Sequence, residues 1–184
     1  EHAPHWYAMS ICSSHMNAAG AGSTAATAFA LANGMVYIQD ILEKGMAIDR
    51  FAPLLCMFLD EREDIFIAVA NFRATRRIWA RLMKDRWGAK DPRSMALKIT
   101  AYSHGGETLR EPLNNIVRIA YAPLGYVLAG VQFLYNASFD EALSLSSEPA
   151  VKVAIRAHHI LANELGIINT VDALGGSYYI ETLT

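Results

Sequence analysis

The sequence predicts an α/β fold, in which a parallel sheet is covered by helices. Four short apolar runs rich in β-prone residues recur along the chain, and each gap between them is long enough for one helix. The gaps carry helical patterns with cap and stop residues. Such an alternation forms either an open doubly wound sheet or a closed (β/α)₈ barrel, and four units alone cannot close a barrel of eight strands.

The four predicted strands cover residues 7–12, 54–59, 95–101 and 131–134. After the first strand, Ser23 can cap a helix, and Gly45 follows that helix as a stop signal. After the second strand comes an acidic segment, residues 60–64, which we expect to be solvated at the start of a helix. Asp64 can cap this second helix, which ends near Gly88.

Two further helices are predicted in the second half of the chain. The third covers residues 113–129, and Pro123 in its interior should kink or break it, because a proline there costs roughly 3 kcal/mol. The fourth begins at Ser147 or Glu148. His158 lies on the apolar stripe of this last helix, so we expect a core histidine whose hydrogen bonds are satisfied.

Composition narrows the functional class. The chain has 184 residues, and 53% of them are hydrophobic, which excludes an extended disordered tail. Its formal net charge is −2, which excludes a protein that binds nucleic acid mainly by electrostatic attraction. The longest apolar run, residues 119–131, has about 13 residues, whereas a membrane span needs roughly 20, so no membrane partner is expected. Two cysteines, Cys12 and Cys56, fit a reducing compartment such as the cytoplasm. Since the sequence has no initiator methionine, we expect it to be a piece of a longer protein.

Candidate functional residues follow the predicted strands, because parallel α/β proteins gather their reacting groups at the carboxyl ends of strands. His15 follows the first strand and His104 the third, and a histidine can hydrogen-bond a carbonyl or move a proton near neutral pH. The segment after the fourth strand contains Tyr135 and Glu141. No metal-ligand spacing is present, so no metal site is predicted. The residues alone therefore indicate an α/β chain with two possible active-site histidines.

Several stretches read together resemble the coenzyme B12-dependent acyl-CoA mutases, the methylmalonyl-CoA mutase family. They occur in the family's order and spacing along nearly the whole chain, at residues 14–16, 19–21, 49–53, 73–80, 112–118, 138–143 and 175–179. The resemblance implies that residues 1–184 are the second half of a (β/α)₈ TIM barrel, part of the domain that binds the acyl-CoA. It also implies a cobalamin-binding domain that this chain does not contain, placed downstream or on another chain.

The activity that the resemblance implies is an intramolecular transfer catalysed by an isomerase. Family members use adenosylcobalamin to move an acyl group between neighbouring carbons by radical chemistry, so the full-length protein or complex would be required. The implied partners are an acyl-CoA substrate and a cobalamin-binding domain or subunit, and we expect a dimer. The implied location is the cytoplasm, or the mitochondrial matrix in a eukaryote.

The resemblance implies a role for each residue that matches one of the family's motifs. His15 matches the histidine that hydrogen-bonds the thioester carbonyl, which makes it the expected catalytic residue and a substrate contact. Gln132 matches a glutamine that lines the reaction cavity, and His104 and Tyr135 at the strand ends are expected to contact substrate.

The expected cofactor contacts are Glu141, Ala142 and Gly105. Glu141 matches a carboxylate that accepts hydrogen bonds from the adenosyl ribose, and the other two match small positions near the cofactor. A second interpretation of Glu141 remains open, in which its carboxylate lies at a helix N-terminus and is stabilised by the helix dipole.

Departures from the family pattern concentrate at the strand ends. Ala18 stands where members have a glutamate, and residues 54–56, Leu-Leu-Cys, stand where they have Arg-Leu-Ser. Phe133 and Tyr135 stand in place of a serine and a histidine. We therefore expect a mutase with an altered, bulkier or less polar acyl substrate. The alternative is a non-catalytic barrel subunit or paralogue that stabilises an active partner.

Overall fold

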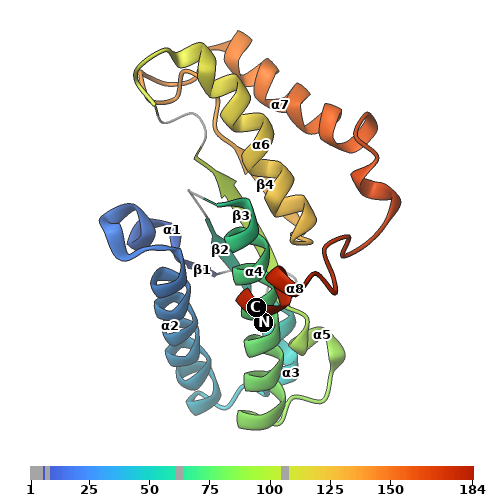
Figure 1. Ribbon diagram of the computed structural model, residues 1–184. Helices are drawn as coiled ribbons and strands as arrows, with labels where there is room; N and C mark the ends of the chain where they lie inside the picture. The colour runs from blue at the N-terminus through green and yellow to red at the C-terminus, as the bar shows by residue number, and fades with distance from the viewer. Residues whose placement is uncertain (1–5, 7–8, 61–63, 105–107) are drawn as a thin grey trace. The chain divides into compact units, whose positions relative to one another are not determined.

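The computed structural model of the chain describes residue 6 and residues 9–60, 64–104 and 108–184 (Figure 1). Four strands form one sheet in the order in which they occur along the chain, and β1 runs parallel to β2 with Ser10 opposite Cys56. The strands are β1 (Ser10–Cys12), β2 (Cys56–Leu59), β3 (Lys98–Ser103) and β4 (Phe133–Asn136). The predicted α/β class is confirmed, and closure into an eight-stranded barrel stays a prediction.

The bounds of β2 and β3 differ from those predicted because a short helix takes the start of each of these two apolar runs, whereas β4 begins two residues later than predicted and so contains Tyr135. A 3₁₀ turn, Ala52–Leu54, takes the start of the second run, so β2 begins at Cys56. In the third run, the Asp91 side chain accepts a hydrogen bond from the Arg93 backbone N–H and caps α5 (Pro92–Met95), which delays β3. Part of the first predicted strand lies outside the described residues.

The chain divides into two compact units, which we describe separately. The first contains the residues up to Leu59 together with Asn71–Thr100, and the second contains Asp60–Ala70 and Ala101–Thr184. Both units draw on α4 (Ile65–Arg81) and on β3, whose residues are shared between them.

The first unit is built on two long helices and the start of the sheet. Its helical segments are α1 (Ser14–Met16), a π turn at Asn17–Ala21, α2 (Ser23–Glu43), α3 (Ile48–Phe51), most of α4, a second π turn at Leu82–Arg86, and α5. The Trp79 side chain on α4 is buried, and its indole N–H donates to the Ser94 carbonyl at 3.1 Å. Gly34 lets α2 approach β1 closely, since a Cβ there would lie 2.9 Å from the Ile11 Cδ1.

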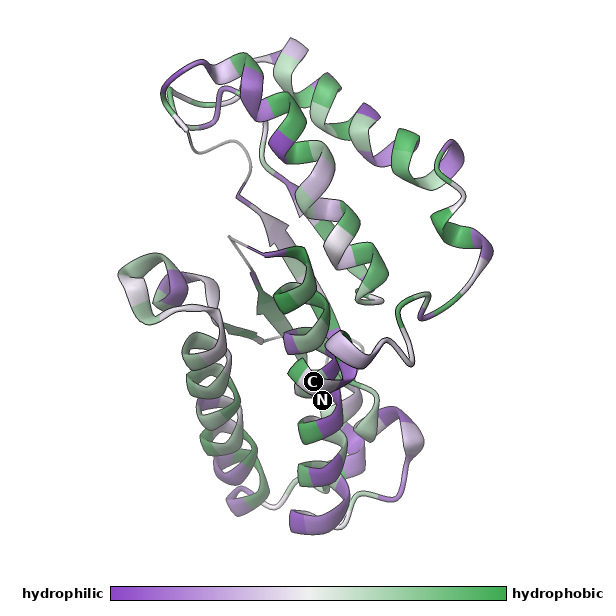
Figure 2. Cartoon of the chain, viewed as in Figure 1, coloured by the Kyte–Doolittle hydropathy of each residue, from purple (hydrophilic) through white to green (hydrophobic). Residues whose placement is uncertain are grey.

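Helix α2 is apolar along most of its length (Figure 2). Among the described residues it is the one helix that is long and apolar enough to cross a membrane, a criterion that core helices of soluble proteins also meet. Its buried side chains include Ala26, Ala30 and Ile38, and α2 packs on β1. This packing is the arrangement expected of a helix that covers a sheet.

The second unit contains a pair of helices that lie side by side, α6 (Asn115–Leu128) and α7 (Glu148–Asn163) (Figure 1). Short segments flank them, namely 3₁₀ turns at Pro112–Asn114 and Ile167–Asn169 and the helix α8 (Tyr178–Leu183). Gly125 permits close contact between α6 and α4, because a Cβ there would lie 2.7 Å from the Ile65 Cγ1. A larger residue at this position would force the two helices apart.

Pro123 does not break α6, which is continuous from Asn115 to Leu128, so the predicted break is wrong. A proline has no N–H to donate to the carbonyl four residues earlier, which is that of Ile119. In the structure the Asn136 side chain, at the end of β4, donates its Nδ2–H to this carbonyl at 2.9 Å. The strand therefore supplies the hydrogen bond that the proline cannot make.

His158 also differs from its expectation. It lies on α7 but is only half-buried, and its Nε2 is buried without a hydrogen-bond partner among the residues that the structure describes. Two effects lower the pKa of His158. The larger is the loss of solvent around its ring, and the smaller is charge repulsion from the neighbouring His159. The expected core histidine with satisfied hydrogen bonds is therefore wrong, because no polar group reaches this nitrogen from the neighbouring described residues.

Replacing Asn136 by alanine should destabilise the full-length protein by about 1–3 kcal/mol, since it leaves the Ile119 carbonyl without its donor. A lower urea midpoint of unfolding would show this. The matched background is Pro123→Ala, which restores a backbone N–H to the same carbonyl, so Asn136→Ala should cost much less there. Equal costs in both backgrounds would mean that the amide does not compensate for the proline.

Candidate active site

His15 lies directly after β1, in α1, and its side chain is exposed. Its Nδ1 is 3.3 Å from the Cys12 sulfur, which is itself 3.0 Å from the Ser14 hydroxyl oxygen. The Ser13 backbone N–H donates to the Phe58 carbonyl at 2.9 Å and so extends the pairing of β1 with β2 as far as this turn. The structure thus places the ring at the carboxyl end of β1, as predicted, while its catalytic role stays a prediction.

The small residues that follow His15 form an exposed turn. Gly20 and Gly22 have φ angles of 96° and 76°, which favour glycine, and a Cβ at either position would meet no atom within 4 Å among the described residues. The backbone conformation therefore explains these glycines, and the turn leaves an open surface beside His15.

In the second unit, His104 is held by a buried carboxylate. The Asp60 Oδ2 lies 2.7 Å from the His104 Nε2, and the two side chains are 0% and 11% exposed. Asp60 was expected to be solvated with its acidic neighbours, and that expectation is wrong. Asp60 directly follows β2, and its side chain is buried there rather than exposed to solvent. A buried carboxylate requires a polar or charged partner, and the His104 imidazole is that partner.

Tyr102 contacts three of the predicted site residues, Glu141, His104 and Tyr135. Its hydroxyl donates to the Glu141 Oε1 at 2.6 Å, and its ring meets the His104 ring edge-on, with centroids 4.3 Å apart. The Tyr135 ring stacks on the Tyr102 ring at 5.2 Å. The structure therefore brings His104, Tyr135 and Glu141 together around a residue that sequence reasoning missed.

Glu141 lies in a turn, and both of its carboxylate oxygens accept hydrogen bonds. Oε1 accepts from Tyr102, and Oε2 accepts from the Ser138 backbone N–H at 3.2 Å. Because α7 begins only at Glu148, Glu141 does not lie in the first turn of a helix. The interpretation in which a helix dipole stabilises Glu141 is therefore wrong.

The turn that carries Glu141 is tied to the start of α7 by Asp140. The Asp140 Oδ2 accepts from the Ser147 backbone N–H at 3.1 Å, and Oδ1 accepts from the Ser138 hydroxyl at 2.9 Å. Hydrogen bonds from Ser147, and then from Ser138, lower the pKa of Asp140. An ionised Asp140 thus holds the turn closed.

The remaining predicted residues are less informative. Gln132 is exposed directly before β4, and its side-chain N–H donates to the Gly130 carbonyl at 2.8 Å, so it lies at the amino end of the strand. Ala142 is half-buried next to Glu141. Gly105 lies outside the described residues. The roles expected for these three residues stay predictions.

As far as the structure describes the chain, it contains no group of three or more histidine, cysteine, aspartate or glutamate side chains that could hold a metal ion. The chemistry open to the described candidates is hydrogen bonding to a carbonyl by His15, acceptance of hydroxyl donors by Glu141, and aromatic contact by Tyr135.

Comparisons with known proteins show what class this α/β chain represents. Residues 1–184 match the family described as methylmalonyl-CoA mutase. A 2-hydroxyisobutanoyl-CoA mutase large subunit from Aquincola tertiaricarbonis is 40% identical over 178 residues, which are 96% of this chain and 32% of that relative. The methylmalonyl-CoA mutase of Escherichia coli K12 is 38% identical over 98% of this chain and 25% of its own length. The human mitochondrial methylmalonyl-CoA mutase is 36% identical over 100% of this chain and 25% of its own length.

The chain belongs to the methylmalonyl-CoA mutase family, which confirms the resemblance seen in the sequence. It spans 25% to 32% of the length of these three relatives, all of which are named as mutases.

Asp140→Asn should lower the melting temperature of the full-length protein at neutral pH. The pKa of Asp140 is lowered in the folded state, so its stabilisation is present above the unfolded value of about 3.9 and is lost as the pH falls through the folded value. Melting curves from about pH 7 to pH 3 should show the gap between wild type and variant closing below about pH 4. A gap that stays constant over this range would contradict the assignment.

Proposed function

We propose that the full-length protein is an adenosylcobalamin-dependent acyl-CoA mutase and that this chain is part of its acyl-CoA-binding barrel domain. The observation that carries the proposal is the match to mutases over the whole chain, at 36–40% identity. The exposed His15 at the carboxyl end of β1 supports it, because barrel enzymes place their reacting groups at that end.

His15 is the proposed catalytic residue, and it acts as a hydrogen-bond donor. An imidazole N–H directed at the thioester carbonyl stabilises charge that builds up on the oxygen. The Cys12 thiol beside Nδ1 can donate to that nitrogen, which leaves the proton on Nε2 and makes Nε2 the donor to substrate. The open turn after His15 admits the ester to this position.

Glu141 fits the hydroxyl groups of an adenosyl ribose. A carboxylate offers about four acceptor positions, and Tyr102 and Ser138 each use one of them. The remaining positions suit two neighbouring hydroxyl donors. When it is bound, the cofactor supplies the radical that starts the rearrangement, while this chain's residues orient the ester and exclude water.

The acyl substrate is proposed to differ from methylmalonyl-CoA. Phe133 and Tyr135 present exposed aromatic rings on β4, 60% and 56% accessible, which favours a bulkier or less polar acyl group. The relative from Aquincola tertiaricarbonis is named for 2-hydroxyisobutanoyl-CoA, so family members differ in the acyl group for which they are named.

The proposal includes a cobalamin-binding domain or subunit as partner, in a dimer, located in the cytoplasm or, in a eukaryote, in the mitochondrial matrix. The name "large subunit" of one relative and the name "mitochondrial" of another are consistent with it. A non-catalytic subunit is the alternative, and the comparisons do not favour it, because these relatives are named as mutases.

An assay of the full-length protein with adenosylcobalamin and a panel of acyl-CoA esters tests the activity. We expect conversion of at least one ester that is larger or less polar than methylmalonyl-CoA, accompanied by the absorbance change of cobalt–carbon cleavage. Cofactor binding without cobalt–carbon cleavage for any ester would contradict the proposal that the protein is an enzyme. Turnover of methylmalonyl-CoA as efficient as that of every other ester would contradict the altered substrate.

His15→Ala should reduce turnover by about 10²–10³, the usual cost of one preorganised donor to a developing oxyanion. The melting temperature should hardly change, because the His15 side chain is exposed and its removal leaves no core cavity. His159→Ala on α7 removes another exposed histidine and serves as the control. A lower melting temperature with full activity per folded molecule would mean that His15 is structural.

A further inference from the structure

Tyr102 lies at the centre of a cluster in the second unit that also contains His104, Tyr135 and Glu141. It is half-buried near the end of β3, and its hydroxyl makes the shortest hydrogen bond to Glu141, at 2.6 Å. A phenol that donates to a carboxylate forms a charge-assisted bond, which is shorter and stronger than a bond between neutral groups. Tyr102 is therefore well suited to fix where the Glu141 carboxylate lies.

The orientation of this carboxylate is determined from two sides. Tyr102 donates to Oε1 from β3, and the Ser138 backbone N–H donates to Oε2 from the turn that carries Glu141 itself. With one donor on each oxygen, rotation of the carboxylate about its terminal bond would break both bonds. The acceptor positions that remain consequently face a defined direction.

Tyr102 is itself held in place by two neighbouring rings. Tyr135 stacks on it with an interplanar angle of 28°, and His104 meets it at 79°. The buried Asp60 in turn binds His104. The phenol is thus anchored independently of Glu141, which is what a group needs if it is to position another.

We propose that Tyr102 is a positioning residue that orients Glu141 to accept the adenosyl ribose, and that it thereby gives the protein a preference for the adenosyl form of cobalamin. The assignment rests on the proposed function. Hydroxocobalamin lacks the adenosyl ribose, so its binding does not use these acceptor positions. Removing the Tyr102 hydroxyl should therefore affect one form of the cofactor and spare the other.

The experiment is a spectroscopic titration of the full-length protein with adenosylcobalamin and, separately, with hydroxocobalamin. Tyr102→Phe keeps the ring and its aromatic contacts and removes only the hydroxyl. We expect it to weaken adenosylcobalamin binding about tenfold, the scale seen when an outer positioning contact is lost. The dissociation constant for hydroxocobalamin should hardly change, which also shows that the variant is folded.

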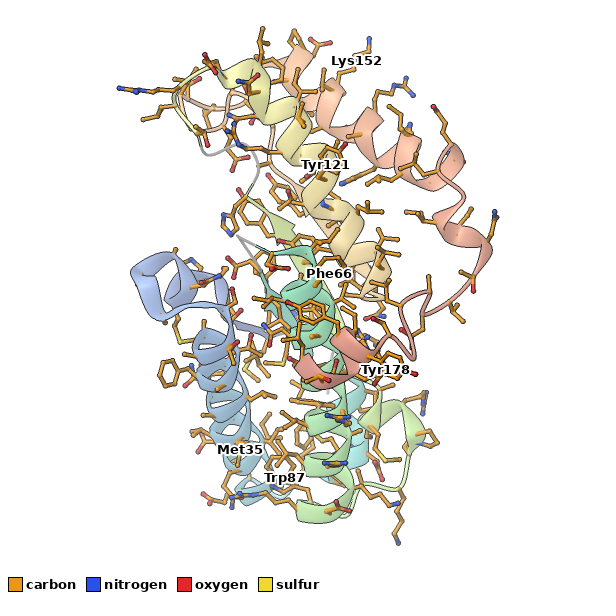
Figure 3. The ribbon with its side chains drawn as sticks, viewed as in Figure 1. Met35, Phe66, Trp87, Tyr121, Lys152 and Tyr178 are labelled. Carbon is orange, nitrogen blue, oxygen red and sulfur yellow. The ribbon has the colours of Figure 1, made fainter. Side chains whose placement is uncertain are left out.

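Two further variants make the result specific. Tyr121→Phe makes the same chemical change on the exposed surface of α6 and should alter neither constant (Figure 3). Glu141→Gln removes the charged acceptor, so adding Tyr102→Phe to it should weaken adenosylcobalamin binding little further. Full additivity of the two changes would overturn the proposal, because Tyr102 would then act independently of Glu141.

The remaining outcomes are also decisive. Equal weakening of both cobalamins by Tyr102→Phe would show a merely structural role, and tighter binding of adenosylcobalamin would show that Tyr102 competes with the ribose for Glu141. Either result overturns the assignment while leaving the proposed function standing. A wild-type protein that binds neither form would overturn the proposed function, and this assignment with it.

Discussion

The hydrogen bond from Asn136 to the Ile119 carbonyl is the constraint on which the second unit's helix and strand arrangement depends. It compensates for the N–H that Pro123 lacks and so keeps α6 continuous. The same bond fixes the end of β4 against α6, and the turn that contains Glu141 begins directly after this point. Helix continuity and the placement of a candidate site residue therefore depend on one side-chain amide.

The local signals in the sequence were sufficient to locate most elements. Asp64 caps α4 as predicted, with its Oδ1 accepting from the Phe66 and Ile67 backbone N–H groups. Gly45 and Gly88 follow the helices with φ angles of 83° and 65°, as stop signals should. These features depend on neighbours within a few residues. The continuity of α6 does not, because the donor that compensates for its proline lies on a later strand.

The same distinction separates the site residues that could be predicted from those that could not. His15 and His104 follow strands, and position along the chain alone indicates the strand ends. Tyr102 and Asp60 matter through partners 39 and 44 residues away in sequence, Glu141 and His104, and nothing in their local pattern marks these pairings. For Tyr102, the available signal was its place two residues before His104, on the same face of the strand.

The division between matching and departing segments has a physical explanation. Asp49, in the matching segment 49–53, accepts hydrogen bonds from the Lys90 and Asp91 backbone N–H groups and from the Ser94 hydroxyl. Replacing it would leave three donors in the first unit without an acceptor, so its identity is bound to the fold. Tyr135, by contrast, is exposed on β4 and makes its described ring contact through stacking, which tolerates different rings. Substitutions at such strand-end positions can therefore change what the site accepts while the supporting structure remains the same.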